Sequence, residues 1–218
     1  MIKKLSKKAS LLSALVLTMA LFAGCSNEKE NQKVADIEVK TIATKELQDK
    51  LSDDSWVVVD TRINDAFNGW KLDEVERGGH IKGAVDFSAN WLTVDSKDKE
   101  KTLDKALETK GIEKDKNIVL YDANGKDAKE VANYLSEKGY KNLYTYNVAD
   151  WAKDESLPME SYENYEMIVP ATIVNDILNG KKPETFEKAK NIKIVEASWG
   201  EESEAYSKGH VPTSVHIN

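Results

Sequence analysis

The spacing of apolar and polar residues between positions 117 and 139 predicts a strand, a short loop and a helix. Ile118 to Tyr121 form a short apolar run, β-branched and aromatic and flanked by polar residues, which is typical of a buried strand. After the loop, apolar residues recur with the i, i+3, i+4, i+7 spacing of one helix face, at Ala128, Val131, Ala132 and Leu135. Gly139 suits the C′ position that ends such a helix.

Further elements alternate in the same way along the chain. Thr44 is placed to be the N-cap of a helix that runs to Leu51, and an apolar strand follows over residues 56–62. A charged helical region spans residues 91–112, and another strand spans residues 142–146. Strands that alternate with helices predict an α/β fold in which helices cover both faces of a parallel sheet.

The loop at residues 122–127 is the first candidate for chemistry. A glycine-containing loop between a strand and a helix N-terminus directs several backbone N–H groups at one spot, where they favour a negative charge. The residue at the head of this loop is Asp122, and the loop contains no cysteine. One interpretation of Asp122 is therefore a helix-capping residue whose carboxylate accepts these N–H groups.

Residues 121–128, Tyr-Asp-Ala-Asn-Gly-Lys-Asp-Ala, resemble the active-site loop of the rhodanese-type sulfurtransferases. That family's pattern is a strand that ends in Cys-Arg-x-Gly-x-Arg/Thr and opens a helix. Gly125 occupies the glycine position, whereas Asp122 stands where the family carries its persulfide-forming cysteine. The resemblance implies a rhodanese-like scaffold with a degenerate active-site loop, made of Asp122, Ala123, Asn124, Gly125, Lys126 and Asp127.

Two further motifs carry the same resemblance, which spans residues 38–158. Residues 79–84 match the family's Gly-His-Ile-x-Gly-Ala signature, and residues 60–62 match its Asp-x-Arg strand end. His80 is either a base or a structural residue bonded to backbone, and we favour the structural role because the loop offers no nucleophile to activate. Asp60 and Arg62 are either a wall of the active site or an ion pair that ties the strand end to neighbouring loops, and we favour the ion pair.

The N-terminal residues indicate export. Residues 1–24 contain a basic segment and then an apolar segment that is too short for a comfortable membrane span, so they predict a signal peptide. The segment ends in Leu-Phe-Ala-Gly-Cys, which resembles the lipobox of bacterial lipoproteins. The resemblance implies that Cys25 is acylated and that the protein is anchored to the cell membrane, facing outside the cytoplasm; the alternative is an ordinary secretory signal with an incidental cysteine. Residues 25–37 are polar and predict a flexible tether.

Residues 159–218 predict a linker and the start of a second, incomplete rhodanese-like repeat. Residues 170–178, 192–198 and 208–218 echo residues 43–51, 57–62 and 79–87, in the same order. No counterpart of the strand, loop and helix at 117–139 follows these echoes. We therefore expect the second repeat to be truncated and to bury too little surface to fold well alone.

Composition excludes several functions. The formal net charge is −7, and residues 1–24 contribute four lysines and no acid, so the remainder is more acidic still. An acidic body with only two arginines, Arg62 and Arg77, argues against nucleic acid as a partner. One cysteine excludes an internal disulfide. His80, His210 and His216 lack ligand partners at useful spacing, so no metal or other cofactor is expected.

The two resemblances together imply a membrane-anchored lipoprotein of the thiosulfate sulfurtransferase family. Because Asp122 replaces the nucleophilic cysteine, we expect no sulfur transfer by this chain, although the family is enzymatic. One alternative is a rhodanese-fold module that binds a protein or a small ligand, cationic or neutral because Asp122 and Asp127 make the loop mouth acidic. Another is a remnant of a full-length sulfurtransferase whose active second domain is missing.

Overall fold

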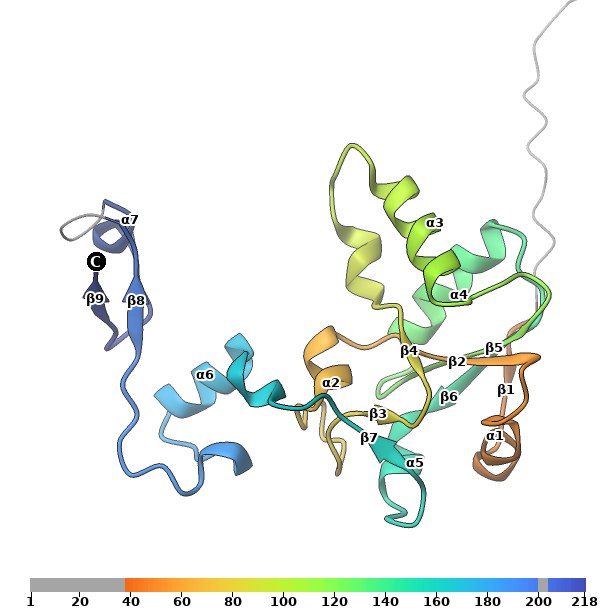
Figure 1. Cartoon of the computed structure of the whole chain (residues 1–218), viewed down its shortest axis with the longest axis horizontal. Helices are drawn as coiled ribbons and strands as arrows, with labels where there is room; N and C mark the ends of the chain where they lie inside the picture. The colour runs from red at the N-terminus through yellow and green to blue at the C-terminus, as the bar shows by residue number, and fades with distance from the viewer. Residues whose placement is uncertain (1–37, 200–203) are drawn as a thin grey trace, which may run out of the picture. The chain divides into compact units, whose positions relative to one another are not determined.

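The computed structural model describes residues 38–199 and 204–218, and these residues build a central five-stranded sheet in the order β1-β6-β5-β2-β4 (Figure 1). Every neighbouring pair in this sheet is parallel. The strands are β1 (Lys40–Thr41), β2 (Trp56–Asp60), β4 (Val85–Asp86), β5 (Asn117–Asp122) and β6 (Leu143–Asn147). The predicted α/β fold with a parallel sheet is confirmed.

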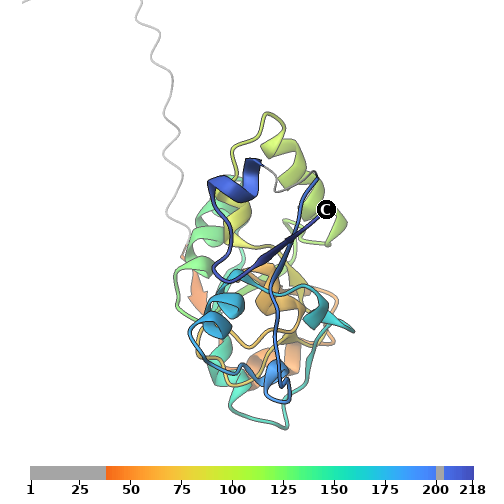
Figure 2. The ribbon, with the colours of Figure 1, turned by 90° about the vertical axis from the view of Figure 1, so that its left-hand side faces the viewer.

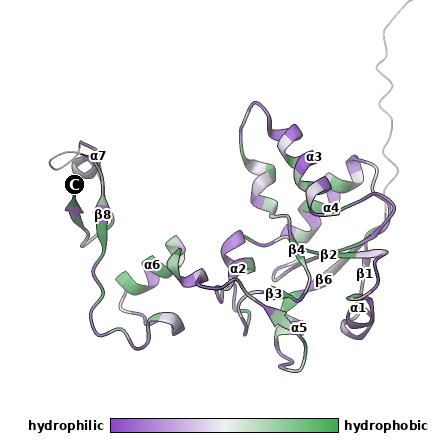
Figure 3. Ribbon diagram, viewed as in Figure 1, coloured by the Kyte–Doolittle hydropathy of each residue, from purple (hydrophilic) through white to green (hydrophobic). Residues whose placement is uncertain are grey.

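Helices cover both faces of the sheet, because β2 and β5 are apolar on both sides. Val59 and Leu120 pack into a core with α3 (Lys99–Thr109) and α4 (Asp127–Glu137). The adjacent Val58 and Val119 point the other way, into a second core with α1 (Thr44–Lys50) and α5 (Val148–Ala152). Figure 1 shows the two layers above and below the sheet, and Figure 3 shows hydrophobic strands beside the largely hydrophilic α3.

The predicted strand, loop and helix at 117–139 form β5 and α4 with nearly the predicted bounds. Gly139 has a φ of +86° just after the C-cap Lys138, so it is the left-handed residue that ends α4. The prediction that Thr44 is an N-cap is wrong. Ala43 holds that position without a side-chain bond, and the Thr44 hydroxyl bonds the hydroxyl of Tyr146 at 2.9 Å, across the domain.

Short elements complete the domain around its sequence motifs. They are α2 (Asn64–Asn68), β3 (His80–Ile81), the 3₁₀ helix η1 (Ala89–Thr93) and β7 (Met159–Glu160). β7 pairs antiparallel with β3, with His80 opposite Glu160 and Ile81 opposite Met159. The first two residues of the segment predicted as a linker and second repeat, Met159 and Glu160, therefore belong to this small sheet.

The C-terminal residues form two 3₁₀ helices, two α-helices and a pair of strands within the described range. The elements are η2 (Tyr165–Met167), α6 (Ala171–Leu178), η3 (Glu184–Phe186), β8 (Val195–Ala197), α7 (Glu204–Lys208) and β9 (Val215–Ile217). β8 and β9 are parallel, with Val195 opposite Val215, and they lie side by side at the front of Figure 2.

In the part of the chain that the structure describes, no helix is both long and apolar enough to cross a membrane. The predicted signal peptide (residues 1–24), Cys25 and the predicted tether (residues 25–37) lie outside the residues that the structure describes.

Candidate functional site: the loop between β5 and α4

The loop between β5 and α4 is organised by the carboxylate of Asp122. This side chain is 1% exposed, and each of its oxygens accepts a backbone N–H. Asp122 Oδ1 accepts from Gly125 at 2.8 Å, and Oδ2 accepts from Ala128 in the first turn of α4 at 2.9 Å. Gly125 has a φ of +73°, which suits glycine and turns the loop back toward α4. An internal anion thus occupies the spot at which the loop amides converge.

The mouth of the loop is acidic. Burial raises the pKa of the Asp127 carboxyl, the charges of Asp122 and Asp73 raise it further, and Lys126 lowers it. Asp73 has a φ of +55°, an uncommon conformation for a residue with a side chain. A second anion that approached this mouth would therefore meet repulsion from at least two carboxylates.

A cavity of about 660 Å³ adjoins the loop, between α4, the edge strand β1 and its neighbour β6. Its lining includes Asp122, Asn124 and Gly125 from the loop, and hydroxyl and amide side chains from elsewhere, including Thr41, Thr145, Asn133 and Asn147. Lys129 contributes a cation. The lining offers hydrogen bonds more than charge, which fits a polar, largely uncharged ligand surface.

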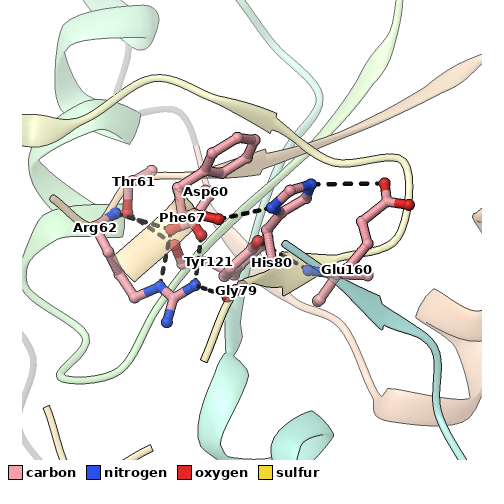
Figure 4. Close-up of polar contacts among 9 residues, drawn as sticks. Asp60, Thr61, Arg62, Phe67, Gly79, His80, Tyr121 and Glu160 are labelled. Carbon is pink, nitrogen blue, oxygen red and sulfur yellow. Dashed lines mark hydrogen bonds and ion pairs between the residues drawn. The ribbon is translucent and has the colours of Figure 1, made fainter. Parts of the chain in front are cut away.

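Asp60 and Arg62 form a buried, bidentate ion pair beside the loop (Figure 4). Arg62 Nε donates to Asp60 Oδ1 at 2.9 Å and Nη2 to Oδ2 at 2.5 Å, while the two residues are 2% and 0% exposed. Nη2 also donates to the Gly79 carbonyl at 2.8 Å. Burial lowers the pKa of Arg62, but the bonds and charge of Asp60 outweigh this and raise it. The pair ties the end of β2 to the Gly-Gly-His segment.

Tyr121 connects this pair to the strand that precedes the loop. It is fully buried, and its hydroxyl accepts the backbone N–H of Ile81 at 3.2 Å. Burial and the charge of Asp60 raise its pKa well above the ordinary value, while Arg62 opposes them. Tyr121 thus stays a neutral hydrogen-bonding residue that joins β5 to β3.

His80 is held by backbone on one side of its ring and by a carboxylate on the other (Figure 4). Its Nδ1 bonds the Phe67 carbonyl at 2.7 Å, so Nδ1 carries the hydrogen, and the two rings stack with centroids 3.8 Å apart. Its Nε2 lies 3.5 Å from Glu160 Oε1, which also accepts the Gly83 N–H at 2.9 Å. His80 therefore links α2, through Phe67, to β7, through Glu160, and is 4% exposed.

Sequence reasoning missed the role of Arg77. Its guanidinium donates to four backbone carbonyls at the end of α5 and just beyond it, those of Trp151, Ala152, Asp154 and Leu157, each at 2.9 Å. The Trp151 and Ala152 carbonyls belong to the last turn of α5, and those of Asp154 and Leu157 belong to the segment after it, so Arg77 fastens the end of this helix to the residues before the Gly-Gly-His segment. The available signal was that Arg77 is one of only two arginines in the chain and lies directly before the Gly-Gly-His segment.

The sheet order and the loop after β5 define the class of protein. The model of the family "Rhodanese-like domain" matches residues 43–152, so the chain belongs to the rhodanese-like family. Similar solved structures include wild-type EanB, with a TM-score of 0.71 and 30% identity over 84% of this chain and 41% of EanB. A complex of an EanB variant with ergothioneine covalently linked to a persulfide cysteine has the same TM-score and identity, over 83% and 41%.

A further similar structure is the anaerobic ergothioneine biosynthesis enzyme from Chlorobium limicola in complex with its natural substrate trimethyl histidine. Its TM-score is 0.70, with 30% identity over 83% of this chain and 41% of the enzyme. This chain therefore spans less than half the length of these structural relatives. No curated protein sequence matches the chain.

Proposed function

We propose that this chain is a rhodanese-like binding module that does not transfer sulfur. The observation that carries the proposal is the carboxylate of Asp122, which holds the N–H groups of Gly125 and Ala128 at 2.8 and 2.9 Å. Persulfide chemistry needs a thiolate at this position, and a carboxylate cannot form a persulfide. The one cysteine of the sequence, Cys25, lies before the domain.

The ligand of such a module is neutral or cationic. Thiosulfate or phosphate would find loop donors already bonded to Asp122 and would meet the charge of Asp127. A cationic group would instead be attracted to this mouth. Trimethyl histidine, which the Chlorobium limicola enzyme binds, carries a quaternary ammonium and a carboxylate, so it is neutral overall and belongs to the favoured class of ligand. The competing candidate is a protein partner that docks at the same acidic mouth.

A rhodanese assay with thiosulfate and cyanide tests the proposal. Residues 26–218 should release no thiocyanate above a protein-free blank, whereas Asp122→Cys should gain activity if the loop amides can serve a thiolate. Thiocyanate release by the unmodified chain would overturn the proposal. If the unmodified protein and the Asp122→Cys variant are both inactive, Ala123 and Asp127 also matter for activity. The interpretation of the chain as a remnant would then gain support.

We also propose that Cys25 is acylated and anchors the domain to the outer face of the cell membrane. The support is the lipobox-like Leu-Phe-Ala-Gly-Cys segment after the apolar run, in residues outside those that the structure describes. More than one acyl chain is needed for stable anchoring. A Cys25→Ser variant should move from the membrane fraction to the soluble fraction and lose labelling by a palmitate analogue. Unchanged membrane association would contradict the proposal.

We further infer that residues 170–218 begin a second rhodanese-like repeat of a tandem protein. The support is that β8 and β9 are parallel, as β2 and β4 are, and that a stacked histidine precedes the second strand of each pair. Nuclear Overhauser contacts between Val195 and Val215 in the full chain would agree with this arrangement. Antiparallel contacts between β8 and β9 would contradict it.

A further inference from the structure

Three Asn-Gly pairs occur in the sequence, and the structure sets one of them apart. They are Asn68–Gly69, Asn124–Gly125 and Asn179–Gly180. The backbone N–H of Gly69 donates to the Asp65 carbonyl at 3.3 Å, and that of Gly180 donates to the Ile177 carbonyl at 3.0 Å. The N–H of Gly125 donates instead to a carboxylate, Asp122 Oδ1, at 2.8 Å. Of the three glycine nitrogens, only this one is bonded to a Brønsted base.

The side chain of Asn124 is folded toward the same nitrogen. Asn124 is exposed, and its Oδ1 accepts the backbone N–H of Lys126 at 2.8 Å. This two-residue hydrogen bond closes a small ring that contains both Asn124 Cγ and the nitrogen of Gly125. No atom beyond the adjacent residues lies within 4 Å of the place where a Cβ of residue 125 would stand. No other described segment therefore crowds Gly125 on the side where its side chain would stand.

We propose that this loop catalyses its own deamidation at Asn124, with Asp122 as the base. The nitrogen of Gly125 attacks Asn124 Cγ from above its peptide plane, while the N–H in that plane passes its proton to Asp122 Oδ1. The Cγ–Nδ2 bond then breaks, the proton is returned to the leaving nitrogen, and ammonia departs from a five-membered succinimide. Water opens the succinimide to aspartate or isoaspartate, so that one amide is exchanged for one carboxylate and no oxidant or reductant is needed.

The arrangement places base, nucleophile and electrophile in one short loop. A base within hydrogen-bond reach of the proton that it removes, and a nucleophile held beside its target, are the two requirements for this type of catalysis. The product changes the loop in two ways. The succinimide nitrogen has no hydrogen for Asp122, and isoaspartate adds a backbone carbon and a negative charge between Asp122 and Asp127. The succinimide thus lacks one of the two bonds that hold the Asp122 carboxylate, until water opens the ring and restores the N–H of Gly125.

Peptide mapping by mass spectrometry of the intact chain, incubated at neutral pH and 37 °C, tests the proposal. Asn124 should convert much faster than Asn179, which is also exposed and precedes a glycine. Asp122→Asn should slow conversion at Asn124 by about 100-fold, the lower end of the effect of a positioned base. A faster or unchanged rate in this variant would overturn the proposal, because it would show that Asp122 only restrains the loop. Glu130→Gln is the matched control for loss of one charge near the loop and should leave the rate at Asn124 unchanged.

The pH profile of the unmodified chain gives a test that does not depend on the folding of a variant. The charged groups near the loop are Asp127, the residues whose charges act on it, namely Lys126, Asp73 and Glu130, and Lys129, which lines the adjoining cavity with Asp122. With Asp122 and not hydroxide as the base, conversion at Asn124 should be constant with pH through the neutral range. Conversion at Asn179 should rise in proportion to hydroxide. A parallel rise at both sites would mean that hydroxide, and not Asp122, removes the proton, and it would overturn the proposal.

Discussion

Two histidines in this chain have the same local surroundings and very different burial. His80 bonds the Phe67 carbonyl at 2.7 Å and stacks on the Phe67 ring with centroids 3.8 Å apart. His210 bonds the Tyr206 carbonyl at 2.9 Å and stacks on the Tyr206 ring with centroids 4.0 Å apart. The interplanar angle is 6° in both pairs. In the sequence, each histidine falls between the two strands of a parallel pair. His80 comes between β2 and β4, and His210 comes between β8 and β9.

What separates the two regions is the unit formed by β5 and α4. β2 has β4 on one side and β5 on the other, and Val59 is completely buried. Within the described residues β8 pairs only with β9, and Val195 and Ile217 are 47% and 51% exposed. Local contacts of a histidine therefore do not create a core. A third strand and a covering helix do, because a two-stranded sheet buries too little apolar surface.

The largest contrast should come from the strand ends. The registers place Asp60 and Glu196 at equivalent positions, each one residue after the valine that faces the partner strand. Asp60→Ala should lower the free energy of unfolding by about 3–5 kcal/mol, because it leaves the buried Arg62 guanidinium without its counter-ion. Glu196→Ala should change it by less than about 0.5 kcal/mol. Urea unfolding of both variants measures the difference, and equal losses would remove the contrast.

A smaller contrast is expected from the histidines themselves. His80→Ala removes a buried ring, its stacking on Phe67 and its bond to backbone, and should cost about 3 kcal/mol. His210→Ala removes the same contacts at an exposed site and should cost less than about 0.5 kcal/mol. Thermal unfolding followed by circular dichroism compares the two. A large loss in His210→Ala would show that residues 204–218 are buried by a partner in solution.

Side-chain truncation in the strands should sharpen the comparison further. Val59→Ala should cost about 2 kcal/mol, because this side chain is fully buried in the core that α3 and α4 cover. Val195→Ala should cost about 0.5 kcal/mol or less, since about half of this side chain is already in water. Unfolding in guanidinium chloride measures both losses, because the shift in midpoint gives the change in free energy of unfolding when the denaturant dependence is the same. Similar midpoints for the two variants would contradict the difference in burial between Val59 and Val195.

The smallest effect is a dependence on pH that only the region with the loop should show. The pKa of the Asp127 carboxyl is raised in the folded protein, so the folded state binds this proton more tightly than the unfolded state does. The resulting stabilisation of the fold is complete at pH values below the unfolded pKa and is lost as the pH rises through the folded pKa. Asp127→Asn should therefore stabilise the domain at neutral pH, by less than about 1 kcal/mol because solvent screens the charges. The gain should vanish in acid. Glu204→Gln in α7 is the control and should show no such trend.

The strand, loop and helix around Asp122 could be predicted from sequence because their signals are local. Apolar spacing, a loop glycine and Gly139 specified β5 and α4 to within a few residues. The capping interpretation of Asp122 also rests on local spacing, and both of its bonds reach residues no more than six positions away. Thr44 looked equally local, yet its hydroxyl bonds Tyr146, 102 positions along the chain. That contact depends on how β6 and α1 pack.

Arg77 and β7 could not be predicted for the same reason. Arg77 donates hydrogen bonds to carbonyls of residues 74 to 80 positions further along the chain. No sequence pattern near Arg77 indicates these contacts. β7 has only two residues, in a polar stretch with no alternation, and it exists because β3 offers it hydrogen bonds. Elements that depend on a distant partner leave little trace in their own sequence.

The pairing of β7 with β3 has a mechanical consequence. A force that pulls on residues after Glu160 acts first on the bonds from Tyr162 to the Asn68 carbonyl and from Trp70 to the Ile168 carbonyl. It then loads β7 and, through Glu160, the ring of His80 and the N–H of Gly83. The force is therefore carried by β3, and the loop that Asp122 organises bears no tension until β7 separates from β3.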